Sequence, residues 1–403
     1  MMKAREAAVR VLQQIENNNE FASLALKKSL SYYLNDTKEK NLTTELVYGV
    51  LRYKMLLDYI RDCYSKIPAN KMDEEIILIL RISIYQIIFC DKIPDSAACN
   101  EGANLAKIFK KSSATGFVNG ILRTISKNKN LIEYPVDNVR KLGILTSFPK
   151  SILNVFINDY GFDKAKEIAE QSNITKPLSY RINYLKAPKD FIVADSVKAP
   201  EHEQVFKDGF ITVQDKGSVS AVDALSPNPD EQILDLCAAP GGKTCYISEK
   251  MNNTGKITAC DIYEHRIELI NNTAKRLGAE NIITVLNDAT KYNEEWEQKF
   301  DRVLTDVPCS GLGVISGKPD IKWRKQNYEE LCDIQLKILL NGMKYVKKGG
   351  ILVYSTCTVH KAENEEIVKK ALTINNEFDV LEQKQLFPCS ENDGFFICKM
   401  KKR

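Results

Sequence analysis

The chain has 403 residues, of which 44% are hydrophobic and 27% are charged, and its formal net charge is +4. This composition is typical of a folded protein and argues against a disordered or fibrous chain, while the small positive charge allows an anionic partner without requiring one. The length exceeds that of one ordinary core and predicts at least two domains.

Residues 1–130 are predicted to form an all-helical domain. Apolar residues recur at spacings of three and four, as in Ala8, Val11, Leu12 and Ile15. The most apolar run, 76–90, contains Arg81 and Gln86 and is shorter than the ~20 apolar residues that a bilayer crossing requires. We therefore expect a buried helix there and no membrane contact. The charged amino terminus also lacks the apolar core of a secretory signal.

Residues 131–214 are predicted to form a small α+β connecting module that could contact RNA. A helix is expected over 152–171, and the alternating runs 178–183 and 209–214 are typical of strands. From residue 215 to 403, apolar strand-like runs alternate with amphipathic stretches, at 232–236, 256–261, 281–286, 302–306 and 351–355. This alternation predicts a doubly wound α/β domain, to which 394–400 adds an antiparallel strand.

The sequence after the first of these strands predicts a ligand-binding turn. Gly241 and Gly242 allow the backbone to approach a ligand, the following helix offers free amides, and Lys243 adds a positive charge. The turn has neither the GxGxxG nor the GxxxxGKS/T spacing of nucleotide-binding loops. Asp261 ends the next strand, where an acid can hold the hydroxyl groups of a ribose, and Asp288 follows the third and could bond an exocyclic amine.

An adenosine with a ribose but without phosphates fits this set of residues, and we expect S-adenosylmethionine. The alternative is that Asp261 and Asp288 are helix N-caps, which aspartate commonly is.

Two cysteines stand in short motifs that indicate covalent chemistry. Carbon 5 of cytosine is a poor nucleophile, so an enzyme that methylates it first adds a thiolate to carbon 6. Cys357, which follows the strand 351–355, is the expected nucleophile, because helix amides at the next turn can stabilise its thiolate. Cys309 would assist release of the base, and Asp306 could bond the N3 edge of cytosine.

The remaining cysteines point to no further chemistry. Eleven cysteines without a CxxC pair and only three histidines argue against a disulfide framework or a metal site, and favour the cytoplasm. Each cysteine alone could be a small buried hydrophobe, and we expect that for Cys63, Cys90, Cys99, Cys260, Cys332, Cys389 and Cys398.

The motifs at 235–244, 306–313 and 354–358 resemble those of the RsmB (Sun/Fmu) family of ribosomal RNA cytosine-C5 methyltransferases. Segments 46–52 and 117–123 resemble the NusB-like domain of that family, so the resemblance covers nearly the whole chain. Lys318 departs from the histidine usual before Pro-Asp-Ile, and Ala362 departs from the acid usual before Glu363-Asn364.

The resemblance implies a Rossmann-like methyltransferase domain at 215–403 and an RNA-binding NusB-like domain at 1–130. It implies Cys357 as nucleophile, Cys309 in release, and small-subunit (16S) ribosomal RNA as the substrate of a monomer. Methyl-donor contacts carried over from the family are Cys237, Ala238, Ala239, Pro240, Gly241, Gly242, Lys243, Asp261, Asp288 and Asp306. Transfer RNA or large-subunit RNA as substrate is one alternative, and a non-catalytic NusB-like assembly factor is another.

Overall fold

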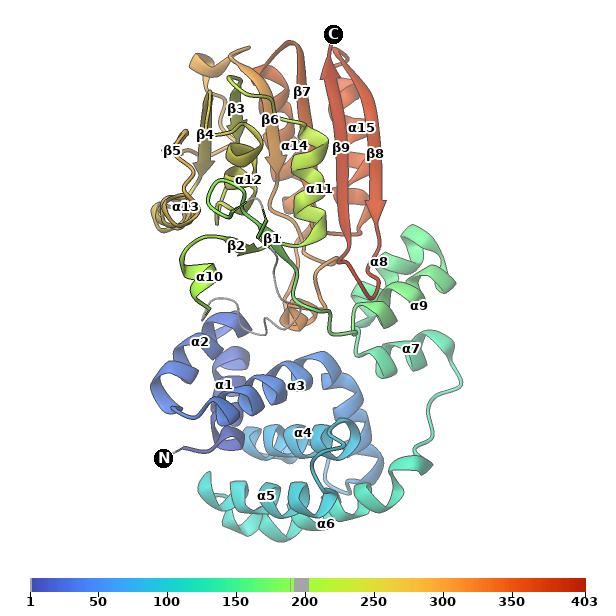
Figure 1. Ribbon diagram of the computed structural model, residues 1–403. Helices are drawn as coiled ribbons and strands as arrows, with labels where there is room; N and C mark the ends of the chain where they lie inside the picture. Colours follow the sequence, from blue (N-terminus) through green and yellow to red (C-terminus); the bar gives the residue numbers. More distant parts are fainter. Residues whose placement is uncertain (1, 189, 192–202) are drawn as a thin grey trace. The chain divides into compact units, whose positions relative to one another are not determined.

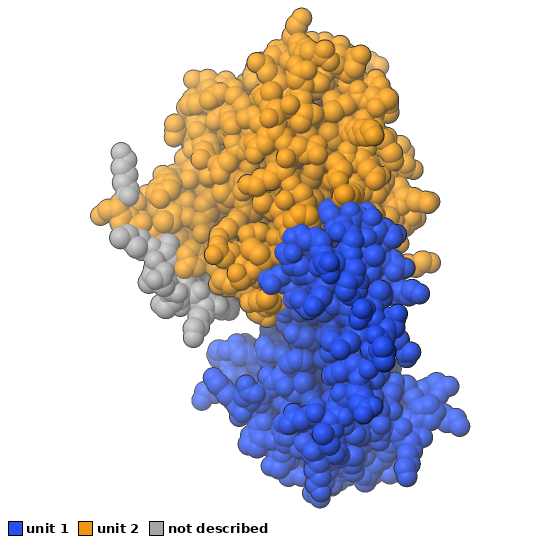
Figure 2. Space-filling view, turned by 90° about the vertical axis from the view of Figure 1, so that its right-hand side faces the viewer, with its two compact units in different colours: residues 1–173, 317–324 blue, residues 174–316, 325–403 orange. Residues whose placement is uncertain are grey.

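The protein is described by a computed structural model, over residues 2–188, 190–191 and 203–403. The chain divides into two compact units, which Figure 2 draws in different colours. Unit 1 comprises Met1–Asn173 and Gly317–Arg324, and unit 2 comprises Ile174–Ser316 and Lys325–Arg403. Unit 1 is therefore built from two stretches that are far apart in the sequence.

The described residues of unit 1 form helices and connecting turns, as predicted for 1–130 (Figure 1). The α-helices are α1 (Ala4–Asn18), α2 (Ala22–Tyr33), α3 (Thr37–Tyr64), α4 (Glu74–Phe89), α5 (Asp95–Ile108), α6 (Thr115–Asn128), α7 (Asn138–Thr146), α8 (Lys150–Tyr160) and α9 (Phe162–Gln171). Short 3-10 turns are η1 (Ala69–Lys71), η2 (Ser112–Ala114), η3 (Lys129–Leu131) and η6 (Pro319–Trp323). Asp36 caps α3 by accepting a hydrogen bond from the Lys38 amide at 2.9 Å.

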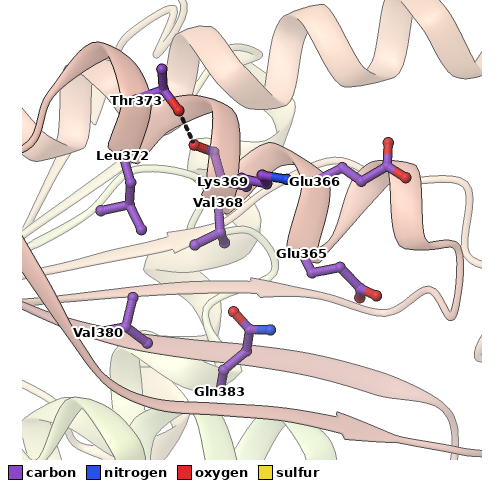
Figure 3. A pocket seen from close by; sticks show the side chains of 8 residues that line it. All are labelled: Glu365, Glu366, Val368, Lys369, Leu372, Thr373, Val380 and Gln383. Atoms are coloured by element: carbon purple, nitrogen blue, oxygen red, sulfur yellow. Dashed lines mark hydrogen bonds between the residues drawn. The ribbon is translucent and has the colours of Figure 1, made fainter.

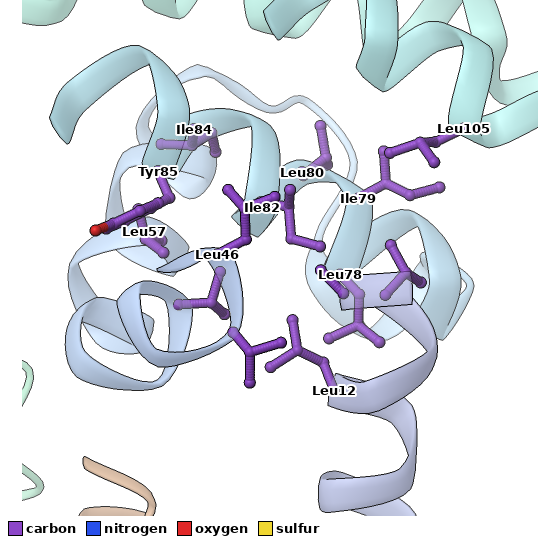
Figure 4. Close-up of a cluster of buried hydrophobic side chains, with 14 of the residues drawn as sticks. Leu12, Leu46, Leu57, Leu78, Ile79, Leu80, Ile82, Ile84, Tyr85 and Leu105 are labelled. Carbon is purple, nitrogen blue, oxygen red and sulfur yellow. The ribbon is translucent and has the colours of Figure 1, made fainter. Parts of the chain in front are cut away.

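Helix α4 lies in the core of unit 1 and is apolar on nearly all sides. Leu78, Ile79, Leu80, Ile82 and Ile84 are all fully buried, and side chains from α1, α3 and α5 surround them (Figure 4). A helix that is hydrophobic all round is stable only when it is covered on all sides. This explains the run at 76–90, which is a buried helix as predicted. Across the part of the chain that the structure describes, no helix combines the length and apolar character needed to span a membrane.

The single helix predicted over 152–171 is wrong in one respect, because the structure has two helices there. Helix α8 ends at Tyr160 and α9 begins at Phe162. Gly161 between them has φ = 78°, a left-handed conformation that glycine adopts without the steric cost other residues incur. The chain can therefore turn sharply at this residue.

Unit 2 contains a seven-stranded sheet and a separate two-stranded ribbon. The sheet order is β5-β4-β3-β6-β7-β9-β8, with β9 antiparallel to its two neighbours and the other pairs parallel. The ribbon pairs β1 with β2 antiparallel. The strands are β1 (Tyr180–Ile182), β2 (Ile211–Val213), β3 (Gln232–Asp235), β4 (Lys256–Asp261), β5 (Ile282–Leu286), β6 (Phe300–Asp306), β7 (Val346–Thr356), β8 (Phe378–Leu386) and β9 (Phe395–Lys402).

Helices cover both faces of this sheet (Figure 1). One face packs against α11 (Lys216–Leu225), α12 (Gly242–Lys250) and α13 (Glu264–Leu277), and the other against α14 (Tyr328–Tyr345) and α15 (Glu365–Ile374). Successive strand residues alternate between the two cores, so that Ile233 joins one cluster and Leu234 the other. Shorter elements are α10 (Gln204–Lys207), η5 (Glu294–Trp296) and η7 (Lys361–Glu363).

The predicted fold class, helices followed by a doubly wound α/β domain, is confirmed. The strands expected from 232 to 355 and at 394–400 are all present, whereas β8 was not predicted. The division at 130/131 and 214/215 stays a prediction: helices α7 to α9 cluster with unit 1, and the ribbon strands β1 and β2 cluster with unit 2.

Candidate active site

The carboxyl ends of three adjacent strands bring the candidate residues to one edge of the sheet in unit 2. In the parallel register, Asp235 of β3 lies opposite Leu304 of β6, and Asp306 of β6 lies opposite Ser355 of β7. The strand order is non-sequential between β3 and β6, which is the switch point where open α/β sheets bind their ligands. The sequence motifs that follow β3, β6 and β7 therefore meet at one site.

The glycine turn leads directly into α12. Gly241 has φ = 102°, a left-handed conformation that strains any other residue, and a Cβ there would lie 3.2 Å from the Cα of Ile270, which is a tight contact. At Gly242, the first residue of α12, a Cβ would meet nothing within 4 Å. The first amides of the helix have no partner within it and are positioned to bind a polar ligand.

Asp261 lies beside this turn. Its side chain is buried, and its carboxylate accepts hydrogen bonds from the Ala239 amide at 3.3 Å and the Ile262 amide at 2.9 Å. The N-cap of the following helix α13 is Tyr263, so Asp261 does not have the capping role considered as the alternative. Asp261 thus links the end of β4 to residues 237–243, which are expected to contact the methyl donor.

Asp288 takes part in a local turn. Its carboxylate accepts hydrogen bonds from the Thr290 hydroxyl at 2.6 Å and the Thr290 amide at 3.1 Å, and the first of these lowers the pKa of Asp288. The preceding Asn287 amide donates to the Asp261 carbonyl at 3.0 Å, which keeps this loop next to the end of β4. The lowered pKa favours an ionised carboxylate at Asp288. A contact between Asp288 and S-adenosylmethionine stays a prediction.

Lys243 and Asp306 form an ion pair at 2.6 Å. The Ser355 hydroxyl donates to the other oxygen of Asp306 at 2.7 Å. Burial lowers the pKa of Lys243, but the charge and hydrogen bond of Asp306, together with the charge of Asp215, outweigh this effect and raise the pKa to about 12. Lys243 is therefore a permanent cation that joins the glycine turn to the Asp-Val-Pro-Cys motif.

The two candidate thiols are in contact. The Sγ atoms of Cys309 and Cys357 are 3.2 Å apart, although 48 residues separate them in sequence. The hydrogen bond with Cys357, then burial, raises the pKa of the Cys309 thiol well above its usual value. Cys309 therefore stays protonated at neutral pH and can donate its hydrogen bond to the sulfur of Cys357.

The expectation that seven other cysteines are buried is only partly right. Cys99, Cys260 and Cys398 are buried, whereas Cys90, Cys332 and Cys389 are partly exposed. For Cys63 the expectation is wrong: this residue is exposed in the last turn of α3, on a side of the helix that the core does not cover.

Several polar residues of this edge were not singled out in the sequence. Asp235 stands in the first motif, and its buried side chain accepts a hydrogen bond from Thr244 at 2.7 Å. Ser355 directly precedes the Thr-Cys motif, a position that could have drawn attention to it. Gln335 and Glu363 contact the loops that carry the thiols. No local pattern marks Gln335, because its partners lie 27 and 28 residues away in sequence.

A separate hollow lies between α15 and β8 (Figure 3). Its volume is about 570 Å³, and it is lined by Glu365, Glu366, Val368, Lys369, Leu372, Thr373, Val380 and Gln383. None of the candidate donor or catalytic residues is among them. The hollow therefore does not belong to the strand-end site.

Comparison with known proteins identifies the family. Residues 222–401 match the family described as 16S rRNA methyltransferase RsmB/F, and residues 2–127 match the NusB family. A Bacillus subtilis protein named "Probable ribosomal RNA small subunit methyltransferase B" is 35% identical over 99% of this chain and 98% of its own length. The chain belongs to the RsmB/F family.

Solved structures share the fold of this RsmB/F member. The crystal structure of PH0851 has a TM-score of 0.79 at 22% identity, and covers 100% of this chain and 99% of its own. NSun6 from Pyrococcus horikoshii with SFG has a TM-score of 0.56 at 21% identity, over 64% of this chain and 99% of its own. Family membership confirms the predicted enzyme class, a ribosomal RNA methyltransferase with S-adenosylmethionine as its methyl donor.

Proposed function

We propose that this enzyme methylates carbon 5 of a cytosine in small-subunit ribosomal RNA, through a covalent bond between Cys357 and carbon 6 of the base. The observation that carries the proposal is the contact of the Cys309 and Cys357 sulfurs at 3.2 Å, at the same sheet edge as the glycine turn. A second thiol in contact with the nucleophile could assist the release of the adduct that the nucleophile forms.

The methyl donor fits the residues at the ends of β3 and β4. Gly242 leaves open space beside the free amides of α12, and the buried Asp261 could accept hydrogen bonds from two ribose hydroxyls. The backbone of Cys237 to Pro240 would line this site. Burial raises the pKa of the Cys237 thiol well above its usual value, so we assign no reaction to that side chain. Bound there, S-adenosylmethionine would supply an electrophilic methyl group.

The thiols would act in sequence. The Cys357 thiolate adds to carbon 6, which makes carbon 5 nucleophilic enough to accept the methyl group. A base then takes the carbon 5 proton, and the electron pair of that C–H bond re-forms the double bond between carbons 5 and 6 as the Cys357 thiolate leaves carbon 6. A protonated Cys309 that donates its hydrogen bond to the sulfur of Cys357 would favour the thiolate form of the nucleophile. We assign to Cys309 a role in release of the product. Stabilisation of Cys357 by amides of the following turn, η7, remains an expectation.

Asp306 would orient the base. Its two oxygens already accept hydrogen bonds from Lys243 and Ser355, which fix the carboxylate in place. A carboxylate offers about four acceptor positions, so that Asp306 could also accept a hydrogen bond from the amino group on the N3 edge of cytosine. Lys243, held by Asp306, would add positive charge beside the donor site.

The substrate and its docking extend the proposal beyond the site. The relative from Bacillus subtilis is named for the ribosomal RNA small subunit. The NusB match covers residues 2–127 of unit 1, and we expect this part of the chain to bind RNA. We propose a basic face in this helical region that comprises Lys107, Lys110, Lys111, Arg123 and Lys127. Lys111 is already paired with Asp73 at 3.0 Å, which weakens its contribution. We propose that the enzyme acts as a monomer in the cytoplasm.

A labelling experiment tests the substrate. The protein is incubated with radiolabelled S-adenosylmethionine and either small-subunit RNA or transfer RNA, and the labelled nucleoside is identified after digestion. We expect 5-methylcytidine in the ribosomal RNA alone. Label in transfer RNA alone would contradict the substrate assignment. If neither RNA is labelled, the incubation is repeated with a partly assembled small subunit, and absence of label there too would contradict the activity.

Cysteine variants test the mechanism. Cys357→Ala should abolish methyl transfer while S-adenosylmethionine still binds, whereas Cys309→Ala should accumulate a covalent adduct between protein and RNA that is visible on denaturing gels. Cys63→Ala, at an exposed cysteine of unit 1, is the matched control and should keep full activity. A fully active Cys357→Ala enzyme would disprove the nucleophile assignment.

A further inference from the structure

The side chain of Glu363 is fully buried between the two loops that carry the thiols. It belongs to η7, which follows β7 and precedes α15. One carboxylate oxygen, Oε2, accepts hydrogen bonds from the Ser310 amide at 2.8 Å and from Gln335 Nε2 at 2.9 Å. The other, Oε1, accepts from the Ser310 hydroxyl at 2.5 Å and the Thr358 hydroxyl at 3.4 Å.

These partners are the immediate neighbours of the thiols in sequence. Ser310 follows Cys309, and Thr358 follows Cys357. The hydroxyl oxygens of Ser310 and Thr358 are also 2.9 Å apart, so the two loops are joined directly as well as through the carboxylate. One buried side chain therefore holds both loops at a point one residue beyond each sulfur.

Gln335 completes the network from the opposite side of Cys309. Its Nε2 donates to the Pro308 carbonyl at 3.0 Å in addition to Glu363. The backbone of Cys309 is thus restrained both before and after the thiol. Burying a carboxylate is costly unless hydrogen bonds satisfy it, and here four donors converge on one group.

We propose that Glu363 is a positioning residue that sets the separation of the Cys309 and Cys357 sulfurs through Ser310 and Thr358. The chemical use of that separation rests on the proposed function, whereas the separation itself can be tested without RNA. Both thiols must reach the same base, so a shift of either loop by 1 Å should lower the rate by about 100-fold. The donor site at β3 and β4 should be unaffected.

Glutamine at this position distinguishes positioning from charge. Oε2 accepts hydrogen bonds from two N–H groups, which can only donate. The side-chain oxygen of glutamine can accept both in place of Oε2. Oε1 faces two hydroxyls, which can accept a hydrogen bond from a glutamine NH₂ group as readily as they donate one. Glu363→Gln should therefore keep both loops in place, whereas Glu363→Ala removes every one of these contacts.

The test measures thiol placement and catalysis in the full-length protein. Diamide takes two electrons and two protons from the two thiols, which form a disulfide while diamide becomes the hydrazine. We would follow the rate of Cys309–Cys357 disulfide formation by mass spectrometry of the peptides. In parallel, kcat and the KM for S-adenosylmethionine would be measured with small-subunit RNA.

We expect the wild type and Glu363→Gln to form the disulfide at similar rates, and Glu363→Ala to form it about 10-fold more slowly. The kcat of Glu363→Ala should fall by about 100-fold with an unchanged KM for S-adenosylmethionine. Glu366→Ala, at an exposed glutamate of the same segment, is the control and should behave as wild type.

Wild-type disulfide formation and kcat in Glu363→Ala would overturn the inference. If that variant does not fold, Ser310→Ala decides, because it removes one arm of the network: an unchanged disulfide rate overturns the inference and a slower rate supports it. If the wild-type enzyme shows no methylation that depends on Cys357, the proposed function is overturned but the positioning role of Glu363 is not. The disulfide rates report the placement of the thiols without any methylation.

Discussion

Asp235 places a carboxylate inside unit 2 with incomplete hydrogen bonding. Its Oδ2 accepts from Thr244, while its Oδ1 is buried and has no hydrogen-bond partner among the residues that the structure describes. Burial raises its pKa to about 7, and the nearby charge of Asp306 adds to the effect. The folded protein therefore favours the protonated carboxyl, unlike the unfolded chain, where the pKa is about 3.9.

This difference predicts a pH-dependent effect of Asp235→Asn. Between pH ~4 and ~7 the folded state keeps a proton that the unfolded state loses, so this group makes the wild type less stable as the pH rises. The substitution removes that effect. We expect the Tm of Asp235→Asn relative to that of the wild type to rise from pH 5 to about pH 7 and then to level off, as measured by differential scanning calorimetry.

The control for this prediction is Asp230→Asn, at an exposed aspartate whose left-handed backbone asparagine also tolerates. Its Tm difference from the wild type should be small and independent of pH. A constant difference between Asp235→Asn and the wild type across this pH range would contradict the raised pKa.

At the scale of elements, η6 is held in unit 1 by a buried lysine. The Lys322 Nζ donates to the carbonyls of Arg52 at 2.6 Å and Thr146 at 3.2 Å, and to the side-chain oxygen of Asn173 at 3.1 Å. It also lies 4.7 Å from the centre of the Phe148 ring. These contacts join α3, the end of α7 and the segment that follows α9 to the five-residue turn η6.

Lys322→Met keeps most of the side-chain volume but removes every N–H donor. Three acceptors lose this partner, and leaving a buried polar group unsatisfied costs about 1–3 kcal/mol. We expect the free energy of unfolding of unit 1 to fall by about this amount in urea titrations followed by circular dichroism. The exposed neighbour Lys325→Met should show no change. Equal stability of the two variants would show that the acceptors do not depend on Lys322.

Unit 1 includes the segment Gly317–Arg324, which lies in sequence between the two stretches of unit 2. Trp323 donates its indole N–H to the Leu51 carbonyl at 2.7 Å, and the Arg324 guanidinium lies 3.5 Å from the centre of the Phe21 ring. Trp323 also packs against the hydrophobic core of unit 1. Residues 1–173 alone therefore lack part of their own fold.

A fragment experiment tests this dependence. Residues 1–173 produced alone should have a low Tm that rises when a synthetic peptide covering 315–326 is added, because a ligand that binds only the folded state stabilises it. A peptide carrying Lys322→Ala and Trp323→Ala is the control and should give no rise. A fragment whose Tm is unaffected by the native peptide would show that unit 1 is complete without η6.

The sequence by itself determined the class of each region. Helical periodicity is a local property, so the spacing of Ala8, Val11, Leu12 and Ile15 was enough to predict α1. Short apolar runs likewise predicted β3 to β7. In β3 and β4 nearly every residue is buried, as in strands covered on both faces, whereas the edge strand β5 is partly exposed. The motifs around Cys309 and Cys357 carried the chemistry, since each is a contiguous set of residues.

Features that depend on long-range contacts became visible only in the folded structure. Strand β8 was missed because most of its side chains are exposed at the edge of the sheet, which leaves no apolar pattern to read. Glu363 and Ser310 are 53 residues apart in sequence, and Lys322 and Arg52 are 270 residues apart. Periodicity and motifs describe neighbours along the chain, whereas these hydrogen bonds exist only after packing has brought distant segments together.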